Sequence, residues 1–447
     1  MKSFVPLLLA LAVGAGAAAD ACAASSHSVP SHTAKAKARI AKAAKKSGKA
    51  ARAGRPEAPA RPAIDYDGEA INFGEWQAVR DFEDDMVARD NFDRAQIEDV
   101  VQRARFIDSA VQLVKPAPPG KPKNWRAYSD RFIEPIRINA GVRFWDDNAD
   151  TLARAQATYG VPAEIIVGIL GVETIYGRDT GRFRIVDVLT TLAFAYPEAP
   201  NRAERMTFFR GELENTLLLA RKENIDPFSL LGSFAGAVGM PQFMPGNILK
   251  YGVDFDGDGV VDLRGSASDA IGSVANFLVQ HGWDRNNAGP AVFPADVAPS
   301  QAWQALLGGL EARYRPQELE GAGVATHTAL PDGRLYGLVD LQNGADPTEY
   351  WVVNANFFAI TKYNRSYFYA MSVVELGSSV SPPRTLYQFV TGLSEIGLCS
   401  CSHDNLYPRG VSTFLLNSSP KKQRIPRIPP LKLSFHHSIP KRAAAHR

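Results

Sequence analysis

The sequence predicts an α+β protein in which helices predominate, on three observations. Most of the chain after residue 72 carries apolar residues at helical spacing. Between about residues 300 and 350 the pattern changes to alternating apolar residues around a Pro-Asp-Gly and an Asn-Gly turn, which indicates a small strand unit. With 45% apolar and 22% charged residues among 447, the composition is typical of a soluble globular protein with about two or three domains.

The N-terminus has the pattern of a secretory signal peptide, over residues 1–23. One lysine precedes an apolar stretch, Phe4 to Val13, that is too short to span a bilayer, and small residues follow it. The pattern predicts export; a lipid-attached Cys22, and with it membrane association, is the open alternative. Only two other cysteines occur, Cys399 and Cys401, so neither a disulfide framework nor a zinc site is expected.

Two basic segments flank the region that we expect to fold. Residues 24–66 place Lys and Arg among Ala, Ser, Pro and Gly, which is typical of a flexible linker. Residues 378–447 are basic, rich in proline and without a sustained period, which predicts a disordered or aberrant tail. A genuine extension and a shifted reading frame would both explain that tail.

Amphipathic helices account for most of the region between these segments. The apolar spacing predicts helices over residues 73–91, 95–114, 143–160, 162–176, 202–222, 267–280 and 302–314. Gly160 is expected to end one helix and Pro162 to begin the next, because glycine favours the left-handed residue after a helix and proline fits the first turn.

One carboxylate, Glu173, lies in the most apolar of these predicted helices, residues 162–176. The large apolar residues there cover most of the helix circumference, which predicts burial: Ile165, Ile166, Ile169, Leu170 and Val172. A buried carboxylate either meets a cation or has a raised pKa and stays protonated. Two interpretations follow, an ion pair with Arg178 or Arg182, or a general acid that donates its proton to a leaving oxygen.

The stretch "DFDGDGVVDL" matches the first half of an EF-hand loop. Asp254, Asp256 and Asp258 alternate, a glycine takes the sharp sixth position, and Val260 offers its carbonyl at the seventh. The twelfth position is Gly265 instead of glutamate. The pattern favours a weak, structural calcium site, with an Asp-rich turn that binds no metal as the alternative.

Several long blocks resemble the membrane-bound lytic murein transglycosylase B family. The blocks are "YGVPAEIIVGILGVETIYGR", "GELENTLLLARKENIDPFSLLGSFAGAVGMPQFMP", "VDFDGDGVVDL" with "DAIGSVANFLVQHGW", "ITKYNRSYFYAM" and "NWRAYSDRFIEPIRINAGVRFW", and they extend over roughly residues 72–376. The resemblance implies a catalytic region at residues 67–377 with a lysozyme-like core, a helical lobe and a small strand-containing part at about 325–370.

The resemblance also implies the reaction, for which no cofactor is needed. Glu173 matches the single catalytic carboxylate of enzymes that cut the β-1,4 bond between N-acetylmuramic acid and N-acetylglucosamine. That glutamate protonates the leaving oxygen, the acetamido group of the substrate stabilises C1, and the glutamate then takes the proton of the C6 hydroxyl as a 1,6-anhydro ring closes. One carboxylate suffices because the nucleophile belongs to the substrate, whereas ordinary glycosidases need two.

The same resemblance implies the residues that line the sugar-binding cleft. They are Ser233, Gln242, Met244, Tyr363, Asn364 and Tyr369, with Tyr196 as a weaker candidate. From the residues alone, Ser233 is a cap or turn residue, and the tyrosine-rich segment 363–369 is expected to be a strand. In the family the calcium loop closes with an aspartate, here Asp269, after one additional residue in "RGSAS".

Two other functions are compatible with these residues. A hydrolytic muramidase would need a second acid to activate water, and Asp179 and Asp187 are nearby in sequence. A non-catalytic peptidoglycan-binding protein is the other alternative, although it would not need Glu173. The expected partners are peptidoglycan glycan strands, together with proteins of cell-wall synthesis or division, in the periplasm. No nucleic-acid partner is expected, and the protein is predicted to be a monomer.

Overall fold

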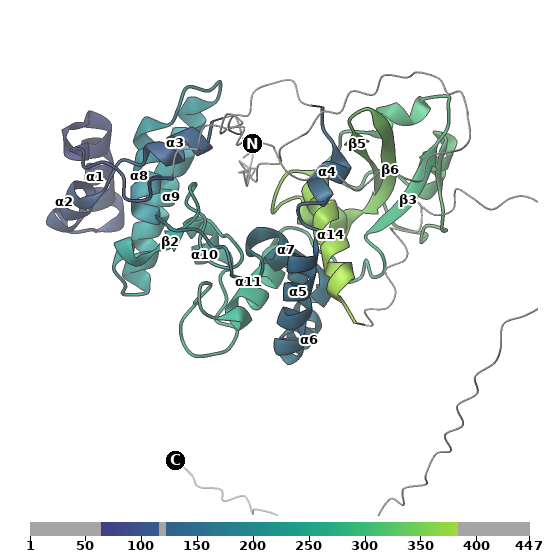
Figure 1. Ribbon diagram of the computed structural model, residues 1–447, viewed down its shortest axis with the longest axis horizontal. Coiled ribbons are helices and arrows are strands. Elements are labelled where there is room, and N and C mark those ends of the chain that lie inside the picture. The colour runs from purple at the N-terminus through teal and green to yellow at the C-terminus, as the bar shows by residue number, and fades with distance from the viewer. Residues whose placement is uncertain (1–63, 116–121, 383–447) are drawn as a thin grey trace, which may run out of the picture. The chain divides into compact units, whose positions relative to one another are not determined.

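The computed structural model describes residues 64–115 and 122–382, which belong to one compact unit (Figure 1). The predicted signal peptide, nearly all of the predicted linker and all but the first residues of the predicted tail lie outside the described residues. Among the described helices, none alone is long and apolar enough to cross a membrane. The pair α6 (Ala149–Tyr159) and α7 (Ala163–Thr174), bent by 116° where they meet, satisfies that criterion by length and composition only.

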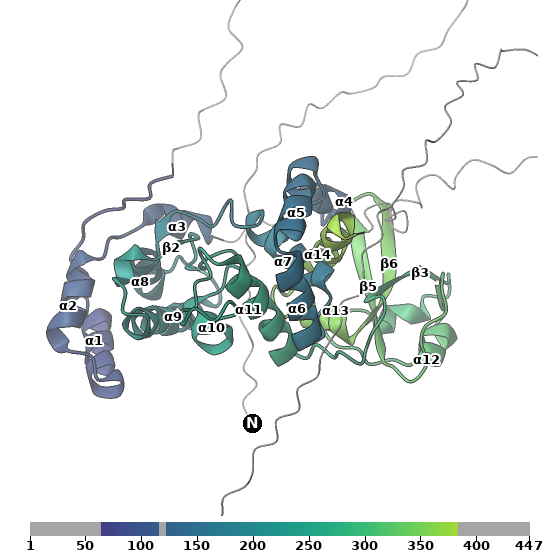
Figure 2. The same ribbon diagram turned by 90° about the horizontal axis from the view of Figure 1, so that it is seen from below.

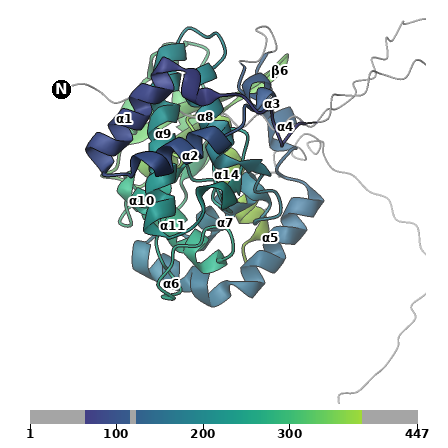
Figure 3. The same cartoon turned by 90° about the vertical axis from the view of Figure 1, so that its left-hand side faces the viewer.

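A helical group forms the N-terminal side of this unit. Figure 3 shows α1 and α2 side by side, and α3 packs against α8, which packs in turn against α9. Its elements are η1 (Phe73–Glu75), α1 (Gln77–Asp90), α2 (Arg94–Arg103), α3 (Asp108–Leu113), β1 (Phe183–Arg184), α8 (Ile185–Ala195), α9 (Arg202–Lys222), η2 (Pro227–Ser229), β2 (Leu231–Gly232) and α10 (Pro245–Tyr251). Strands β1 and β2 pair as a short antiparallel ribbon.

A second helical group surrounds α7, the helix that carries Glu173 (Figure 2). It consists of α4 (Trp125–Ser129), α5 (Pro135–Asp147), α6 (Ala149–Tyr159), α7 (Ala163–Thr174), α11 (Ala267–Gln280) and α14 (Tyr367–Val380). Helices α7 and α14 approach closely because glycines stand at their contact. A methyl group on Gly168 or on Gly377 would lie less than 3.0 Å from a backbone carbonyl oxygen of the other helix.

The main sheet has four antiparallel strands in the order β4-β3-β6-β5. The strands are β3 (Val292–Val297), β4 (Val324–Thr326), β5 (Tyr336–Asn343) and β6 (Asp346–Asn354), accompanied by η3 (Ala302–Leu306), α12 (Pro316–Gly321) and α13 (Ala355–Ile360). The hairpin of β5 and β6 turns at Asn343 and Gly344, whose φ of 67° is in the left-handed region. This is the predicted Asn-Gly turn. The prediction of an α+β protein that is mostly helical is therefore confirmed.

Four predicted helices are shorter than their apolar patterns. In the segment 73–91, η1 is followed by the non-helical Trp76, and α1 begins only at Gln77. The segment 143–160 is not one helix: α5 ends and α6 begins at Asn148, which leaves the helical conformation and whose side-chain amide donates to the Phe144 carbonyl (2.8 Å). The segment 95–114 is split into α2 and α3 by a bridge between Phe106 and Glu69. The segment 302–314 holds only η3, because Gly308 has a φ of 88°.

The limits of the strand unit also differ from the prediction. β3 lies before the expected start at about residue 325. It was not predicted because it contains a proline, a residue that is depleted in strands. The tyrosine-rich segment 363–369 is not a strand. Ser366 caps α14 through its hydroxyl, which accepts from the Tyr369 N–H (3.3 Å), and the buried residues that follow recur at helical spacing. Tyr363 and Asn364 therefore lie in the turn before α14, and Tyr369 lies in its first turn.

Candidate active site

Glu173 lies in the last turn of α7, where it is partly buried. The apolar residues that predicted burial of the helix are all buried: Ile165, Ile166, Ile169, Leu170 and Val172. The helix ends directly after Glu173 and Thr174, because Ile175 and Tyr176 both take the left-handed conformation, with φ of 51° and 58°. The chain thus changes direction just beyond the acid, so that the Glu173 side chain lies at the C-terminal end of an apolar helix.

Thr174 connects this helix end to the loop that holds Gln242. Its buried hydroxyl donates to the Met240 carbonyl (2.8 Å) and accepts from the Gly177 N–H (2.9 Å). The hydroxyl therefore ties the turn that follows Glu173 to the segment 239–244, which the family resemblance placed in the sugar-binding region.

The direct partner of Glu173 is Tyr369, from the first turn of α14. The Tyr369 hydroxyl donates to Glu173 Oε1 at 2.6 Å. The ring of Tyr363 is stacked on that of Tyr369, with ring centroids 6.2 Å apart and planes 13° apart, and its own hydroxyl donates to the Pro241 carbonyl. Two of the predicted tyrosines are therefore gathered with the predicted acid.

The protonation of Glu173 is controlled by burial and by neutral groups. Burial raises the pKa of Glu173 to about 7, while the hydrogen bond from Tyr369 lowers it. Within the described residues Glu173 forms no ion pair, so the expected alternative, a bond to Arg178 or Arg182, is not what the structure shows. A carboxyl group with a pKa of about 7 holds a proton in a substantial fraction of molecules at neutral pH, as a general acid requires.

Tyr128 on α4 belongs to the same site, and the sequence reasoning missed it. Burial, with the charge of Glu173 as the second cause, raises the pKa of Tyr128 to about 12. Its ring packs against Phe132 and Phe368, with centroids 5.2 Å and 5.5 Å away. The only signal in the sequence was the density of aromatic residues in "NWRAYSDRF", which gives no indication that α4 folds back toward α7 and α14.

Two further predicted sugar-binding residues, Ser233 and Gln242, use most of their polar atoms in hydrogen bonds within the protein. Ser233 is buried, and its Oγ accepts from the N–H groups of Ala235 and Ala237 (3.4 and 3.0 Å), which is the turn role that the sequence also allowed. The Gln242 amide nitrogen donates to the Gly239 carbonyl (2.9 Å) and, more weakly, to Thr180, so only its oxygen remains free.

Three other predicted sugar-binding residues, Met244, Asn364 and Tyr196, lie in different parts of the fold. Met244 is the residue before α10. Its side chain lies so close to Gly236 that a methyl group added to Gly236 would lie 3.4 Å from Met244 Cε. The Asn364 side chain is half-buried and makes no hydrogen bond within the part of the chain described. Tyr196 is 5% exposed and stacks on Phe209 at 5.7 Å, so the structure gives it a core position and does not bring it to Glu173.

Among the described residues, neither of the two acids considered for a hydrolytic mechanism is paired with Glu173. Asp187 is fully buried and is held by the Arg184 guanidinium (2.5 Å) and the Arg105 N–H (3.0 Å). Asp179 is exposed, and its backbone N–H donates to the Thr174 carbonyl. The two carboxylates that a hydrolytic mechanism would have to recruit are therefore committed elsewhere or turned to solvent.

The predicted calcium loop gathers three of its five candidate ligands. One oxygen each from Asp254, Asp256 and Asp269 lie within 4.8 Å of one another. Asp258 and Val260 are exposed and stand outside this group. Three carboxylates form a hard, anionic donor set, and Ca²⁺ prefers such oxygen ligands, so the residues present fit the ion.

Comparison with known proteins agrees with this geometry. The family model described as "Transglycosylase SLT domain" matches residues 74–378. The chain is 42% identical over 315 residues to membrane-bound lytic murein transglycosylase B of Escherichia coli, covering 68% of this chain and 83% of that protein.

Solved structures give the same result. Soluble lytic transglycosylase SltB1 of Pseudomonas aeruginosa is 41% identical, with 69% of this chain and 100% of that chain covered and a TM-score of 0.63. Lytic transglycosylase Slt35 of E. coli in complex with calcium is 38% identical, with 73% and 100% covered and a TM-score of 0.63. SltB3 of P. aeruginosa in complex with NAG-NAM-pentapeptide is 28% identical, with 68% and 79% covered and a TM-score of 0.58.

The matched region contains nearly all of both helical groups, the whole sheet and every residue gathered around Glu173. The lysozyme-like fold that the sequence resemblance implied is therefore confirmed. The chain belongs to the transglycosylase SLT domain family.

Proposed function

We propose that Glu173 is the single acid and base of a transglycosylase reaction on peptidoglycan. The chain is a lytic murein transglycosylase, a lyase that cleaves peptidoglycan. The observation that supports the assignment is the isolation of Glu173: its pKa is raised to about 7, and it has a tyrosine hydroxyl as direct partner. In the part of the chain that the structure describes, neither Asp179 nor Asp187 is placed to activate water. A single carboxylate suits a reaction in which the substrate supplies its own nucleophile.

The first step is proton donation to the glycosidic oxygen. The protonated carboxyl of Glu173 gives its proton to the oxygen that leaves with N-acetylglucosamine, while the acetamido carbonyl of N-acetylmuramic acid bonds to C1. Glu173 is then an anion, and the Tyr369 hydroxyl, already 2.6 Å from Oε1, stabilises that charge.

The second step restores the acid. Glu173 accepts the proton of the muramic acid C6 hydroxyl as O6 attacks C1, which releases the acetamido group and closes the 1,6-anhydro ring. No water enters the balance, and the proton lost in the first step returns in the second. The apolar residues of α7 favour this return, because burial penalises the charged form of the carboxyl.

The sugar-binding residues are a proposal at this stage. We assign substrate contacts to Tyr128 and Tyr363, whose partly buried rings suit sugar rings, and to Tyr369 through its hydroxyl beside Glu173. The Asn364 amide and the Gln242 amide oxygen suit hydroxyl or acetamido groups. Ser233 and Met244 shape the loop beside them. Tyr196 is not included, because the structure buries it against Phe209.

We further infer a structural calcium ion at the loop 254–269. Asp254, Asp256 and Asp269 would hold it, and its positive charge would offset the repulsion among three carboxylates. Asp269 lies in the first turn of α11, so the ion would tie the loop to that helix. It takes no part in the glycosidic chemistry.

The location and boundaries of the enzyme are also proposed. Residues 1–23 support export to the periplasm, and the family match at residues 74–378 supports a catalytic region at 67–377. The proposed partner is the peptidoglycan glycan strand. Contacts with other proteins of the wall machinery stay an expectation from the sequence.

The test is the mass of the products released from purified sacculi. The wild-type protein is expected to release muropeptides that are lighter by one water than the hydrolytic products, and Glu173→Gln is expected to lower the rate by at least about a hundredfold. Hydrated products would identify a hydrolase instead. A Glu173→Gln variant with wild-type activity would refute the assignment of the acid.

A further inference from the structure

The turn that follows Glu173 has a backbone conformation that its residues disfavour. Ile175, Tyr176 and Gly177 take successive φ angles of 51°, 58° and 85°. Residues other than glycine rarely adopt such angles, and for a β-branched residue such as isoleucine they are a genuine outlier. Among the described residues, the other non-glycine positions with positive φ are asparagines and glutamines: Asn91, Asn224, Gln242 and Gln301. Strain of this kind persists only where the surrounding contacts maintain it.

The Thr174 side chain holds this turn from two directions. Thr174 is 1% exposed, and its hydroxyl accepts from the Gly177 N–H at 2.9 Å. The hydroxyl donates to the Met240 carbonyl at 2.8 Å, which is closer than the Leu170 carbonyl at 3.4 Å. Because a hydroxyl has one proton to donate, Met240 is its main acceptor. One side chain therefore closes the turn and attaches it to the segment 239–244.

The same segment also holds the tyrosines beside Glu173. The carbonyl of Pro241, next to Met240, accepts from the Tyr363 hydroxyl. The ring of Tyr363 is stacked on that of Tyr369, which donates to Glu173 Oε1 (2.6 Å). The acid and its tyrosine partner are thus both attached to one short piece of backbone. The contacts form a closed circle, which we name the contact circle, through Glu173, Thr174, Met240, Pro241, Tyr363 and Tyr369.

We propose that Thr174 is a positioning residue for the transglycosylase reaction, and that its hydroxyl keeps the Glu173 carboxyl aligned with the Tyr369 hydroxyl. The proposal rests on the proposed function, because it concerns the acid assigned there. Without the Thr174 hydroxyl the carboxyl is still present, but the strained turn after it loses its attachment to the contact circle. The Met240 carbonyl and the Gly177 N–H then lose a partner as well.

Met240 is fixed independently of Thr174. Its N–H donates to the Leu263 carbonyl (2.8 Å), and a methyl group on Gly239 would lie 2.4 Å from that carbonyl oxygen. Leu263 is itself buried, so this anchor belongs to the core. Removal of the Thr174 hydroxyl is therefore expected to release the turn after Glu173 and to leave the segment 239–244 in place. The defect is expected in kcat, which reports proton transfer, and not in KM.

The experiment compares Thr174→Val with Thr174→Ser. Valine has nearly the shape of threonine without the hydroxyl, whereas serine keeps the hydroxyl. The release of 1,6-anhydro products from soluble glycan strands, measured over a range of strand concentrations, gives kcat and KM. Thr174→Val is expected to lower kcat by about ten- to hundredfold and to keep KM within about twofold, since a misplacement on the order of 1 Å costs about a hundredfold. Thr174→Ser is expected to keep kcat within about threefold of the wild type.

A double-mutant cycle with Tyr369→Phe tests how Thr174 acts. The single change Tyr369→Phe is expected to lower kcat about as much as Thr174→Val does. In the Tyr369→Phe protein, Thr174→Val is expected to lower kcat by less than about a further threefold, because the alignment that the hydroxyl maintains is already lost. A merely structural threonine would give losses that multiply.

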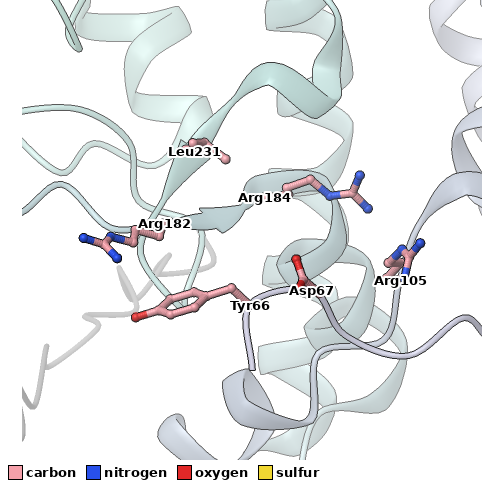
Figure 4. A pocket seen from close by; sticks show the side chains of 6 residues that line it. All are labelled: Tyr66, Asp67, Arg105, Arg182, Arg184 and Leu231. Atoms are coloured by element: carbon pink, nitrogen blue, oxygen red, sulfur yellow. The ribbon is translucent and has the colours of Figure 1, made fainter. Parts of the chain in front are cut away.

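The matched control is Thr191→Val on α8. Thr191 is fully buried, and its hydroxyl likewise accepts from one backbone N–H, that of Ile107 (3.0 Å), and donates to one carbonyl, that of Arg105 (3.3 Å). These partners lie outside the contact circle: Arg105 lines an open pocket of about 570 Å³ beside the β1–β2 ribbon (Figure 4). Thr191→Val is expected to lower the midpoint of thermal unfolding, as Thr174→Val does, and to keep kcat within about twofold of the wild type.

Four results would overturn the proposal: wild-type kcat in Thr174→Val, an equal loss in Thr174→Ser, an equal loss in Thr191→Val, or losses that multiply in the cycle with Tyr369→Phe. If Thr174→Val does not fold, Thr174→Ala replaces it in the same comparisons. Failure of the proposed function is a separate outcome, since it would be the absence of 1,6-anhydro products from the wild-type protein.

Discussion

Glu173 lies among apolar side chains and tyrosine hydroxyl groups, and none of the described residues places a cation beside it. Its raised pKa is therefore the result of removal from water, and the hydrogen bond from Tyr369 is the one specific contact that opposes the shift. Burial and this bond act in opposite directions, so the pKa of the acid can be altered at Tyr369 without changing the charge of any residue.

We expect Tyr369→Phe to move the alkaline limb of the profile of kcat/KM against pH to higher pH. The limb falls as pH rises through the pKa of Glu173, because the first step needs the protonated acid. Without the hydroxyl the charged form loses stabilisation, and the pKa rises above its present value of about 7. A shift of about one pH unit is expected, since hydrogen bonds to charged groups contribute about 1.5–3 kcal/mol and water recovers part of it.

The matched control for this experiment is Tyr350→Phe, in the sheet, which should leave the limb where it is. An unchanged limb in Tyr369→Phe, or one that moves to lower pH, would contradict the assigned role of the hydroxyl.

The residues around Glu173 show how much of a site can be predicted from a sequence. The apolar helix drew attention to Glu173, but its residues alone left an ion pair and a general acid both open, and the assignment as the acid came from the family resemblance. Tyr363 and Tyr369 came from the family resemblance, and nothing in their local pattern revealed them. Tyr128 was missed because its relevance depends on the packing of α4 against α14, which carries Phe368, 240 positions later in the chain than Tyr128.

At the scale of elements, the contact of α7 with α14 places the acid and its tyrosine together. Glycine at positions 168 and 377 lets the two helices approach backbone to backbone. The pairing of Glu173 with Tyr369 thus depends on two glycines that lie outside that pair.

We expect Gly168→Ala to destabilise the protein by about 1–3 kcal/mol or more, because the new methyl group overlaps the Val373 carbonyl and forces the helices apart. Gly211→Ala on α9 is the control: nothing lies within 4 Å of the added methyl group, and the change should stabilise the helix by about 0.5–1 kcal/mol. Urea unfolding of both variants measures the difference. Equal effects of the two substitutions would show that the close approach is unimportant.

The loop before α11 gives a second prediction at this scale. Added Ca²⁺ is expected to raise the midpoint of thermal unfolding in a concentration-dependent way, since an ion bound only by the folded state stabilises it by mass action. Asp256→Asn should abolish this effect, because it removes one of the three gathered carboxylates. Mg²⁺ at the same concentration is the control, and an equal response to both ions would argue for general screening of charge.

The elements themselves were predicted unevenly. Residues 202–222 and 267–280 form helices with the predicted bounds because their periodicity is long and uninterrupted. The break at Asn148 was missed since apolar spacing continues across it. β3 was missed because its hydrogen bonds go to β4 and β6, which lie 27 or more residues away, and its own six residues contain a proline.

At the scale of the whole molecule, buried acids make stability depend on pH. Glu375 on α14 accepts a hydrogen bond from Ser129 (2.8 Å), and burial raises its pKa to about 7, with the charge of Glu349 as a further raising cause. A folded-state pKa above the unfolded value means that stability is fully present at low pH and declines as pH rises from about 4.5 to above 7.

We expect Glu375→Gln to be more stable than the wild type at pH 8 and nearly equal to it at pH 5. The amide stays neutral and its oxygen still accepts from Ser129, so the penalty of ionisation is removed. That penalty is at most about 3 kcal/mol, at 1.36 kcal/mol for each pKa unit. Urea unfolding at the two pH values tests it, with the exposed Glu198→Gln as control. The same difference at both pH values would exclude ionisation as the cause.

The hydrogen bond between Tyr369 and Glu173 joins residues that are 196 positions apart. Contacts between residues so far apart in sequence form late in folding, because the entropy cost of closing a long loop precedes the stabilisation that the contact contributes. Until then Glu173 is solvated like any other glutamate, with an ordinary pKa near 4.5, and is ionised at neutral pH. A chain that is still being synthesised or is only partly folded therefore carries no proton donor, and the capacity to cut the cell wall arises only when the fold is nearly complete.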